Sequence, residues 1–433
     1  FDPMLSIEQQ QRYDEKKGEY RQQIWRNGLR FRGSLGEYFA FRFSLRDNHV
    51  QDGRWENQRV PLEVLQESGW PYLTRGENGK VDYDENLAVL TFTHKYFYVV
   101  YGREYNEWGF GRKGNLLLST NAPLYDQIKM VIRYWKFKFT HLTAFLQYIS
   151  PIGRVAMKQQ PYMDVFWSGN RLELQVGGGL QLGFSEAILY GDRSLQPGYL
   201  HPLAFFKSME HFYGDRDNGL LGLDFEWRLW PGWKIYGEWL IDDITTGKVG
   251  SDFYGNKFGW QAGFLAVNPL GIPDVDILLE YTRIKPYVYS QSFQDYNKYK
   301  HYDTVLGHEI GPNSDDWVLR VQKRFSRFLQ LSAELEQYRH GANLPGMNAG
   351  GDPDRPFGSG DDKNAPFLAG ERNWQTAWGV SLEYEAVRNL QLYLQYRRFQ
   401  FNHTEWLDLY AFRLSLNFGD RPEPIPSVFP LAY

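Results

Sequence analysis

Residues 171–184 read RLELQVGGGLQLGF, and apolar and polar side chains alternate along this stretch. Leu172, Leu174 and Val176 fall on one face of an extended chain, and Arg171 falls on the other. A period of two is typical of a β-strand whose two faces meet different surroundings. We therefore interpret the stretch as a strand with one apolar face and one polar face.

The same alternation recurs along most of the chain. It predicts a first hairpin over residues 29–46, with a turn near Gly36-Glu37 and arginines that point inward. The other strand candidates, which share alternating patterns bounded by turn residues, are 87–101, 130–148, 163–168, 219–229, 233–241, 258–267, 275–284, 317–325, 328–338, 373–385, 389–401 and 406–418. Allowing roughly 20 to 25 residues per strand and connection predicts about 16 to 18 strands.

The lengths of the connections indicate how these strands are arranged. Tight turns such as 230–233 contrast with long polar connections at 285–316 and 339–372. Short turns at one end and long loops at the other are typical of outer-membrane barrels. We therefore predict an all-β fold, an antiparallel transmembrane β-barrel of about 16 to 18 strands.

The composition favours a membrane location for this barrel. The 433 residues include 15 Trp, 30 Tyr and 30 Phe, and such rings are favoured where hydrocarbon meets lipid headgroups. The mean hydropathy of −0.55 fits strands of which half the residues face a polar lumen. We expect the barrel to contact the lipid bilayer of a bacterial outer membrane. A large water-soluble β protein is the alternative.

Three parts are expected along the chain. Residues 1–27 are predicted to be a helical segment, because residues 4–26 are rich in Gln, Glu and Arg, and Ser6 precedes Gln9 at capping-box spacing. The barrel is predicted over 28–418, with a short helical piece from Pro61 to Glu67 in one connection and 406–418 as the closing strand. Residues 419–433 are rich in proline, and we expect an extended tail there.

Several classes of function are disfavoured by the sequence. The chain has no cysteine, and its net charge of −4 offers no footprint for nucleic acid. Gly109, Gly111 and Gly114 satisfy G-x-G-x-x-G, but no helix pattern follows that could receive a pyrophosphate. No HExxH or G-x-S-x-G motif occurs. We therefore expect neither a cofactor nor enzymatic activity.

One loop is unusually acidic. Its carboxylates are Asp352, Asp354, Asp361 and Asp362. Carboxylate oxygens on a flexible backbone could hold Ca²⁺, although the spacing is not that of an EF-hand. The other interpretation is a mobile polar loop without a metal.

Residues 102–123 carry a motif: GREYNEWGFGRKGNLLLSTNAP. This segment resembles the capsule-assembly outer-membrane proteins of the Wzi family, whose pattern is similar to G-R, a few residues, W-G-P-G, a short gap and L-L-L-S-x-N-A-P. Phe110 stands where the family usually has proline. Similar stretches extend from about residue 88 to residue 245.

The resemblance implies a barrel of about 18 strands whose lumen is occluded by helical and loop elements. It also implies a lectin-like role, in which the protein binds or anchors surface polysaccharide without chemistry. The motif residues that could contact sugar are Arg103, Trp108, Arg112, Asn115 and Asn121. The glycines of the motif are Gly102, Gly109, Gly111 and Gly114.

Several alternatives stay open at this point. The motif can fold a lumen-facing loop rather than contact sugar, with Trp108 as a packing residue. Aromatic residues of a second loop form another possible external platform: Tyr287, Tyr289, Phe293, Tyr296, Tyr299 and Tyr302. A diffusion porin would use the same strands around an open lumen, and a passive scaffold would bind unknown protein partners.

Overall fold

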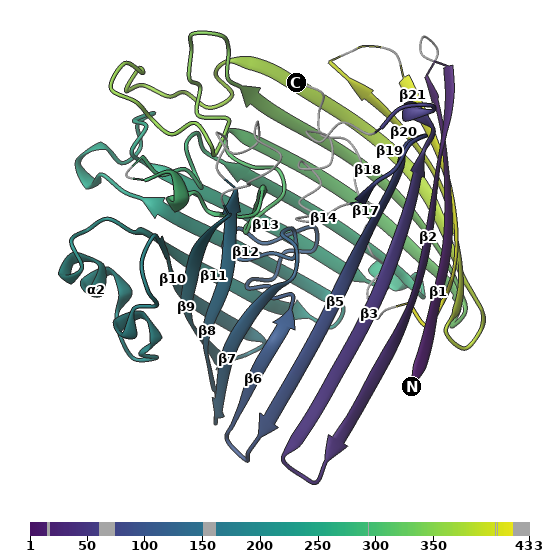
Figure 1. Ribbon diagram of the computed structural model, residues 1–433, viewed down its shortest axis with the longest axis horizontal. Coiled ribbons are helices and arrows are strands. Elements are labelled where there is room, and N and C mark those ends of the chain that lie inside the picture. Colours follow the sequence, from purple (N-terminus) through teal and green to yellow (C-terminus); the bar gives the residue numbers. More distant parts are fainter. Residues whose placement is uncertain are drawn as a thin grey trace.

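The structure is a computed structural model that describes residues 1–14, 18–59, 74–149, 162–292, 294–402, 404 and 406–418. It is a closed antiparallel β-barrel of 18 strands (Figure 1). The barrel strands are β1 (Asp2–Asp14), β2 (Gly18–Leu35), β3 (Phe39–Asp52), β5 (Lys80–Thr93), β6 (Phe97–Glu104), β7 (Tyr125–Tyr134), β8 (Phe137–Ile149), β9 (Tyr162–Gly177), β10 (Leu180–Gly191), β11 (Asn218–Trp230), β12 (Trp233–Asp243), β13 (Lys257–Val267), β14 (Val275–Ile284), β17 (Ser314–Ser326), β18 (Leu329–Ala342), β19 (Glu371–Val387), β20 (Leu390–Phe401) and β21 (Trp406–Leu416). The predicted fold class and the upper end of the predicted strand number are confirmed.

The barrel closes where the first strand meets the last. β21 pairs with β20 on one side and with β1 on the other, from Leu5 opposite Leu416 to Tyr13 opposite Asp408. This pairing removes the sheet edges, so the backbone groups in the wall are bonded to neighbouring strands. The prediction that 406–418 holds the closing strand is confirmed.

The predicted N-terminal helix is wrong. Residues 2–14 and 18–35 form the hairpin of β1 and β2, so the barrel begins at Asp2 and not at residue 28. Helix propensity is a weak preference that tertiary context overrides. Here Glu8 and Gln10 point into the lumen and Leu5 and Ile7 point outward, so the segment fits a wall strand with two faces.

The stretch RLELQVGGGLQLGF is not one strand but a hairpin. β9 ends at Gly177 and β10 begins at Leu180, and Gly178 and Gly179 between them have positive φ values of 58° and 79°. The alternation continues across this turn, because Leu182 pairs with Leu174. The apolar face is therefore continuous from one strand to the next.

The outward face of the strands carries a belt of exposed apolar side chains. Representative members are Leu5, Ile7, Leu29, Phe31, Phe41, Leu45, Leu90, Tyr101, Ile128, Leu172, Leu182, Phe184, Leu223, Trp260, Leu279, Trp378, Leu394 and Phe412. The inward face is polar, and the predicted inward arginines are confirmed, since Arg42 pairs with Glu104 and Arg46 with Glu85. An apolar outer band around a polar interior is the pattern of outer-membrane barrels.

The longest connections lie at one rim of the barrel, and most connections at the other rim are short. The loops of the long-loop rim include 105–124, 192–217, 244–256, 285–313 and 343–370. They contain the small sheet of β15 (Lys300–His301) and β16 (Thr304–Val305) and the helix α2 (Phe206–Phe212), while β4 (Thr74–Arg75) pairs with β5. Among the described residues, no helix has the length and apolar character needed to cross a bilayer. The predicted helical piece at Pro61–Glu67 and the tail at 419–433 lie outside the described residues.

Replacing Glu8 by Ala is expected to destabilise the barrel by about 3–5 kcal/mol, because it removes the carboxylate that neutralises the buried guanidinium of Arg26. The two side chains form an ion pair at 2.9 Å, in which Arg26 is 4% exposed and Glu8 is 0% exposed. The matched control is Glu19→Ala, which removes a carboxylate from the exposed pair with Arg21 on the same hairpin and is expected to cost at most about 1 kcal/mol. Equilibrium unfolding in guanidinium, from detergent micelles, measures both. Equal effects of Glu8→Ala and Glu19→Ala would contradict the argument.

Candidate functional site

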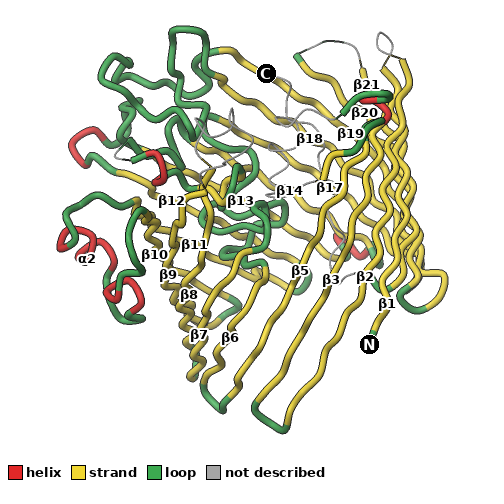
Figure 2. Tube along the Cα trace, in the orientation of Figure 1, coloured by secondary structure: helices red, strands yellow, loops and turns green. Residues whose placement is uncertain are grey.

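The segment 105–124, which carries most of the Wzi-like motif, folds into the lumen from the long-loop rim. Figure 2 shows loops inside the ring of strands at this level. Trp108 forms a β-bridge with Leu118, and its ring meets that of Trp167 edge-on at 5.2 Å. Leu116 and Leu117 are at most 1% exposed and belong to a buried cluster with inward side chains of the wall. The motif therefore forms part of a plug.

A carboxylate on β12 holds the backbone of this segment. Glu238 accepts hydrogen bonds from the N–H groups of Leu116 at 2.8 Å and Leu117 at 3.1 Å. The carbonyl oxygens of the same two residues accept hydrogen bonds from the hydroxyls of Tyr289 at 2.6 Å and Tyr299 at 2.8 Å. Buried backbone groups need partners, and these four side-chain contacts supply them where no strand is available.

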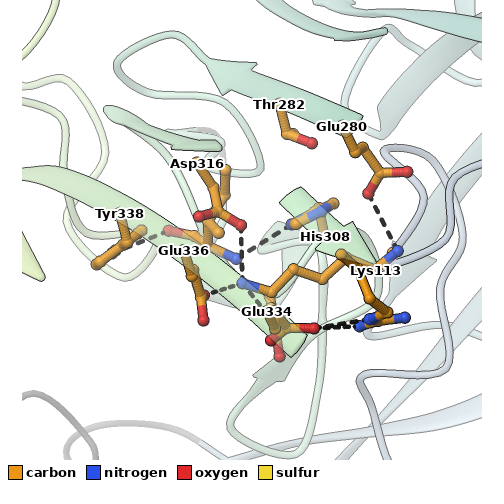
Figure 3. A network of polar contacts seen from close by, with 12 residues as sticks. Lys113, Glu280, Thr282, His308, Asp316, Glu334, Glu336 and Tyr338 are labelled. Carbon is orange, nitrogen blue, oxygen red and sulfur yellow. Dashed lines mark hydrogen bonds and ion pairs between the residues drawn. The ribbon is translucent and has the colours of Figure 1, made fainter. Parts of the chain in front are cut away.

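A second carboxylate, on β14, holds the preceding turn (Figure 3). Glu280 accepts hydrogen bonds from the N–H groups of Arg112 at 2.7 Å and Lys113 at 3.0 Å. The ammonium of Lys113 lies between the carboxylates of Asp316, at 2.7 Å, and Glu336. Burial opposes the charge of Lys113, but the carboxylates of Glu336 and Asp316 outweigh it and raise its pKa. The lysine thus fastens the turn to β17 and β18.

At two positions of the motif only glycine fits, because a Cβ atom there would clash with neighbouring atoms. Gly109 has a φ of +132°, and a Cβ there would lie 2.4 Å from the side-chain oxygen of Asn115. A Cβ on Gly111 would lie 1.9 Å from the carbonyl oxygen of Gly114, a distance that atoms cannot adopt. Gly102 lies in β6, and Gly114 packs against the ring of His308. These glycines let the chain turn tightly inside the lumen.

The structure brings three of the predicted sugar-binding residues together in the plug. Trp108 is 5% exposed and Asn115 is 2% exposed. The side-chain oxygen of Asn115 accepts a hydrogen bond from the N–H of Gly111 at 2.9 Å. The amide of Asn121 donates to the carbonyl of Val305 at 3.1 Å, which ties the motif to the loop 285–313.

The structure separates the two predicted arginines from this group. Arg103 lies on the outward face of β6, where it forms a double hydrogen bond with Asp126 of β7 at 3.0 and 2.7 Å. The side chain of Arg112 is exposed, although its backbone is held by Glu280. Arg103 and Trp108 are five positions apart in sequence but lie on opposite sides of the wall, so they do not form one cluster.

The Tyr-rich loop 285–313 fills the lumen beside the motif and is not an external platform. Tyr287, Tyr289, Tyr296 and Tyr299 are at most 7% exposed. The rings of Tyr289 and Tyr299 stack at 5.6 Å, and the N–H of Tyr289 donates to Asp242 at 2.6 Å. Tyr302 is only partly buried, and Phe293 lies outside the described residues. The hydroxyls of Tyr289 and Tyr299 donate to backbone carbonyls of the motif, and that of Tyr287 donates to the carbonyl of Asn348 at 2.9 Å.

A polar cavity of about 310 Å³ lies below the plug, between Trp108 and the short-turn ends of β8 and β9. It is lined by Tyr98, Tyr105, Asn106, Glu107, Trp108, Gly109, Lys129, Val131, Lys138, Thr140, Arg171 and Glu173. Its charges are paired, with Lys138 to Glu173 at 2.6 Å and Arg171 to Asp224 at 2.6 Å. The lower lumen is therefore lined by balanced charges.

The carboxylates of the acidic loop do not converge. Asp354 pairs with Lys300 at 2.8 Å, and Asp361 accepts a hydrogen bond from Asn348 at 2.7 Å. Asp352 and Asp362 accept hydrogen bonds from nearby backbone N–H groups. Within the described part of the chain, no group of three or more His, Cys, Asp or Glu side chains could hold a metal ion. The calcium interpretation has no geometric support.

Sequence reasoning placed Tyr289 and Tyr299 on an external platform rather than in the plug. It gave no plug-holding role to the acidic residues Asp242, Glu238, Glu280, Asp316 and Glu336. One signal was available, because acidic side chains at inward positions of apolar strands must find partners inside the barrel. The partners themselves are far away in sequence, and only the closed barrel brings them together.

The double variant Glu238→Ala/Glu280→Ala is expected to loosen the plug. Each substitution deprives two backbone N–H groups of their acceptor, at a cost of about 1–3 kcal/mol per buried group. Ion conductance in planar bilayers should rise from a silent baseline in the wild type to frequent openings in the variant. The control is Glu226→Ala, an inward glutamate of β11 that pairs with Lys234 at 2.7 Å. Openings of the same frequency in the control would contradict the conclusion that Glu238 and Glu280 hold the plug.

Acidification is expected to weaken the plug through two histidines. Burial lowers the pKa of His308 to about 3, with Lys113 acting in the same direction, and burial lowers the pKa of His301 to about 4. Unfolded histidine titrates near pH 6.5, so the stability from these neutral rings is complete above about pH 6.5 and is lost as the pH falls toward 4 and 3. Each contributes a slope of up to about 1.4 kcal/mol per pH unit.

Guanidinium unfolding at pH 7.5, 6.5 and 5.5, followed by tryptophan fluorescence, measures this slope. The variant His301→Gln/His308→Gln should show a flatter dependence on pH than the wild type. The exposed His211→Gln should behave as the wild type does. A dependence that is unchanged in the double variant would assign the pH effect to other groups.

Comparison with known proteins shows which family and which solved structures this chain resembles. The sequence matches the family described as capsule assembly protein Wzi over residues 5–405. The Escherichia coli Wzi structure, described as an outer-membrane protein involved in group 1 capsule assembly and a carbohydrate-binding β-barrel, superposes with a TM-score of 0.60 at 12% identity, covering 96% of this chain and 85% of that one.

Two barrels from Pseudomonas aeruginosa also share the fold. OccK8 (OprE) has a TM-score of 0.51 at 10% identity, covering 96% of this chain and 97% of that chain. OccK10 (OpdN) has a TM-score of 0.50 at 11% identity, covering 96% of this chain and 98% of that chain. No curated protein matches the sequence. Since the family match extends over nearly the whole barrel, and the motif lies in the plug of an outer-membrane fold, the chain belongs to the capsule assembly protein Wzi family.

Proposed function

We propose that this chain holds surface polysaccharide at the outer membrane by non-covalent binding and leaves the polymer chemically unchanged. Membership of a family described as capsule assembly proteins supports this role. The Escherichia coli barrel of the same fold is described as carbohydrate-binding. The polar cavity and the loops contain charged side chains that are engaged in ion pairs, which suits binding better than turnover.

The filled lumen is the observation that carries this proposal over a diffusion porin. Loops 105–124 and 285–313 pack against each other and against the wall, with Leu116, Leu117 and Tyr299 almost fully buried. A porin needs a continuous water path, whereas a retention protein needs loops that are held in place. Buried packing inside the barrel supplies a fixed base for the loops above it.

The contact surface that we propose is a patch on the long-loop rim, which in the usual arrangement faces the cell exterior. We define the rim patch as Phe253, Tyr254, Phe357, Lys248 and Arg355. The rings of Tyr254 and Phe357 stack at 3.5 Å, and the ammonium of Lys248 lies 4.0 Å from the ring centre of Phe253. The three rings are partly exposed, and both basic side chains are exposed.

The loops that carry the rim patch hold each other in place. The N–H of Tyr254 donates to the carbonyl of Lys363 at 3.1 Å, and Phe253 forms a β-bridge with Asn364. The amide of Asn348 donates to Asp361 at 2.7 Å within the second loop. Fixed loops lose little conformational entropy on binding, so their surface is suited to a polymer whose single residues bind weakly.

The chemistry of the rim patch matches that of a sugar. Pyranose rings present C–H faces that pack on aromatic rings, and their hydroxyls bond to planar charged side chains. Lys248, which lies over the ring of Phe253, offers three donors, and the exposed Arg355, two residues before Phe357, offers five. Acidic residues of a polysaccharide would be attracted to both cations.

We infer a positioning role for part of the motif. Trp108, Asn115 and Asn121 support the plug on which the rim loops stand, through the contacts with Trp167, Gly111 and Val305. The exposed Arg112 is the motif residue whose side chain is available to a ligand that enters the lumen. Arg103 pairs with Asp126 outside the wall, and we assign it to the stability of the strand ends.

The double variant Phe253→Ala/Phe357→Ala is expected to weaken binding of capsular polysaccharide about tenfold, which corresponds to about 1.4 kcal/mol. The reason is the loss of two ring surfaces that would pack against sugar. Surface plasmon resonance, with purified polysaccharide passed over the barrel in detergent micelles, gives the affinity. The matched control is Trp135→Ala, which removes a ring that is 78% exposed at the opposite, short-turn rim.

The same experiment separates the other candidate roles. Binding that is equal in the wild type and the rim variant would move the site away from the rim patch. Absence of polysaccharide binding together with co-purification of a protein would favour the passive scaffold. Size-exclusion chromatography of the polymer after incubation should show an unchanged length, and shortened chains would contradict a non-enzymatic role.

A further inference from the structure

The connection between β10 and β11, residues 192–217, lies outside the barrel and not over the lumen. We call it the outer-wall segment. It contains a 3₁₀ turn at Pro197–Leu200 and the helix α2, and Figure 1 shows α2 on the outer side of the strands. The N–H of Phe206 donates to Glu186 of β10 at 3.0 Å. The amide of Asn170 of β9 donates to the carbonyl of Ala204 at 3.2 Å.

The wall beneath the outer-wall segment is polar. Outward positions of β8, β9 and β10 alternate with inward members of the buried core, and the outward side chains here are His141, Thr143, Ser168, Asn170 and Glu186. None of them is more than 8% exposed. Uncovered polar groups on the lipid side of a barrel are destabilising. The outer-wall segment is therefore a built part of the wall that covers these groups.

The segment is seated by aromatic packing and an ion pair. The ring of Tyr199 lies 4.9 Å from that of Tyr190 on β10 and 5.7 Å from that of Phe206 on α2. The hydroxyl of Tyr199 donates to Asp217 at 2.7 Å, and Arg193 pairs with the same carboxylate at 2.5 Å. These contacts fix the orientation of α2 relative to the wall.

This orientation leaves three large apolar side chains on the surface that points away from the barrel. Leu203 is 83% exposed, Phe205 is 51% exposed and Phe212 is 81% exposed. Full exposure of such side chains to water is unfavourable, because apolar surface is stabilised when it is removed from water. Three of them on one short segment mark a surface that meets an apolar phase.

The adjoining barrel surface identifies that phase as lipid. Phe184 on β10 belongs to the apolar belt and is 40% exposed, and its pairing partners Leu172 and Leu223 are 41% and 42% exposed. Glu186, which receives the N–H of Phe206, is two residues farther along the same strand. The outer-wall segment is thus attached to the wall directly beyond the lipid-facing belt, one pleat farther toward the long-loop rim.

We propose that the outer-wall segment is a lipid-contact element, whose Leu203, Phe205 and Phe212 insert among the acyl chains at the long-loop edge of the bilayer. The polar groups of the same segment lie at the level of the lipid headgroups. Lys207 represents them, with ion pairs to Glu210 at 2.7 Å and Asp215 at 3.3 Å. Leu203 and Phe205 precede α2 and Phe212 ends it, so exposed apolar side chains and charged groups lie side by side on one short segment, as they do in elements that lie at a membrane interface.

The absence of cysteine from the chain allows a direct test with single-cysteine variants. Leu203→Cys and Phe212→Cys are labelled with a polarity-sensitive fluorophore, and the full chain is reconstituted in phosphatidylcholine vesicles. Both labels should be quenched at least twofold more by lipids with a nitroxide near the top of the acyl chain than by lipids with a nitroxide near its end. Aqueous iodide should quench them weakly.

Two labelled variants serve as references. Leu182→Cys lies in the apolar belt, and Ser359→Cys lies in an exposed part of the loop 343–370. The labels at 203 and 212 should resemble the one at 182 in their response to iodide. Because Leu203 and Phe212 are more than four-fifths exposed, their substitution removes little packing within the chain.

Labels at 203 and 212 that respond to iodide as the label at 359 does, and that ignore the nitroxide lipids, would overturn the proposal. The exposed patch would then face water in vesicles and be free for a protein partner or a second copy of the chain. Quenching strongest by the nitroxide near the chain end would also overturn it, because it would place the segment deep in the bilayer rather than at its edge.

Discussion

Closure of the hydrogen-bond ladder between β1 and β21 is the constraint on which the rest of this structure depends. In the hydrocarbon region no water can satisfy a free N–H or C=O group, so a sheet is tolerated there only when it has no edge. The first and last strands must therefore pair, and their register decides the direction of each side chain. That register points Glu8 into the lumen, where Arg26 meets it, and Leu5 and Ile7 toward lipid.

Closure with 18 strands creates a second requirement, because such a ring encloses more space than wall side chains can fill. Loops 105–124 and 285–313 enter this space, and their irregular backbone arrives with unpaired polar groups. Glu238 and Glu280 accept from the N–H groups, and the hydroxyls of Tyr289 and Tyr299 donate to the carbonyls. Acidic strand residues and loop tyrosines thus replace the strand partners that the loops lack.

The plug and the outer-wall segment divide the molecule into regions with different physical roles. The plug fills the lumen from within and supports the loops of the long-loop rim, which carry the polysaccharide contact that we propose. The outer-wall segment covers polar wall residues such as Asn170 and Glu186, and it is attached directly beyond the apolar belt. In the function that we propose, a pull from the bound polymer is resisted by both, because the plug fixes the loops and the outer-wall segment is proposed to contact lipid.

The alternation of residues such as Leu172 and Arg171 was enough to determine the strands, the inward arginines and the barrel class, because a period of two is a local property of the chain. Residues 4–26 were misjudged as helix because their Gln-rich composition is a local preference, whereas their pairing with β2 and β21 is not local.

What only the tertiary structure decided is which distant groups meet. Arg103 and Trp108 are close in sequence, yet the wall passes between them, because Arg103 occupies an outward position of β6 and the chain then turns into the lumen. Glu238 lies more than one hundred positions in sequence from Leu116, whose N–H donates a hydrogen bond to it. Such contacts depend on register and closure, two properties of the whole ring that no single stretch of sequence contains.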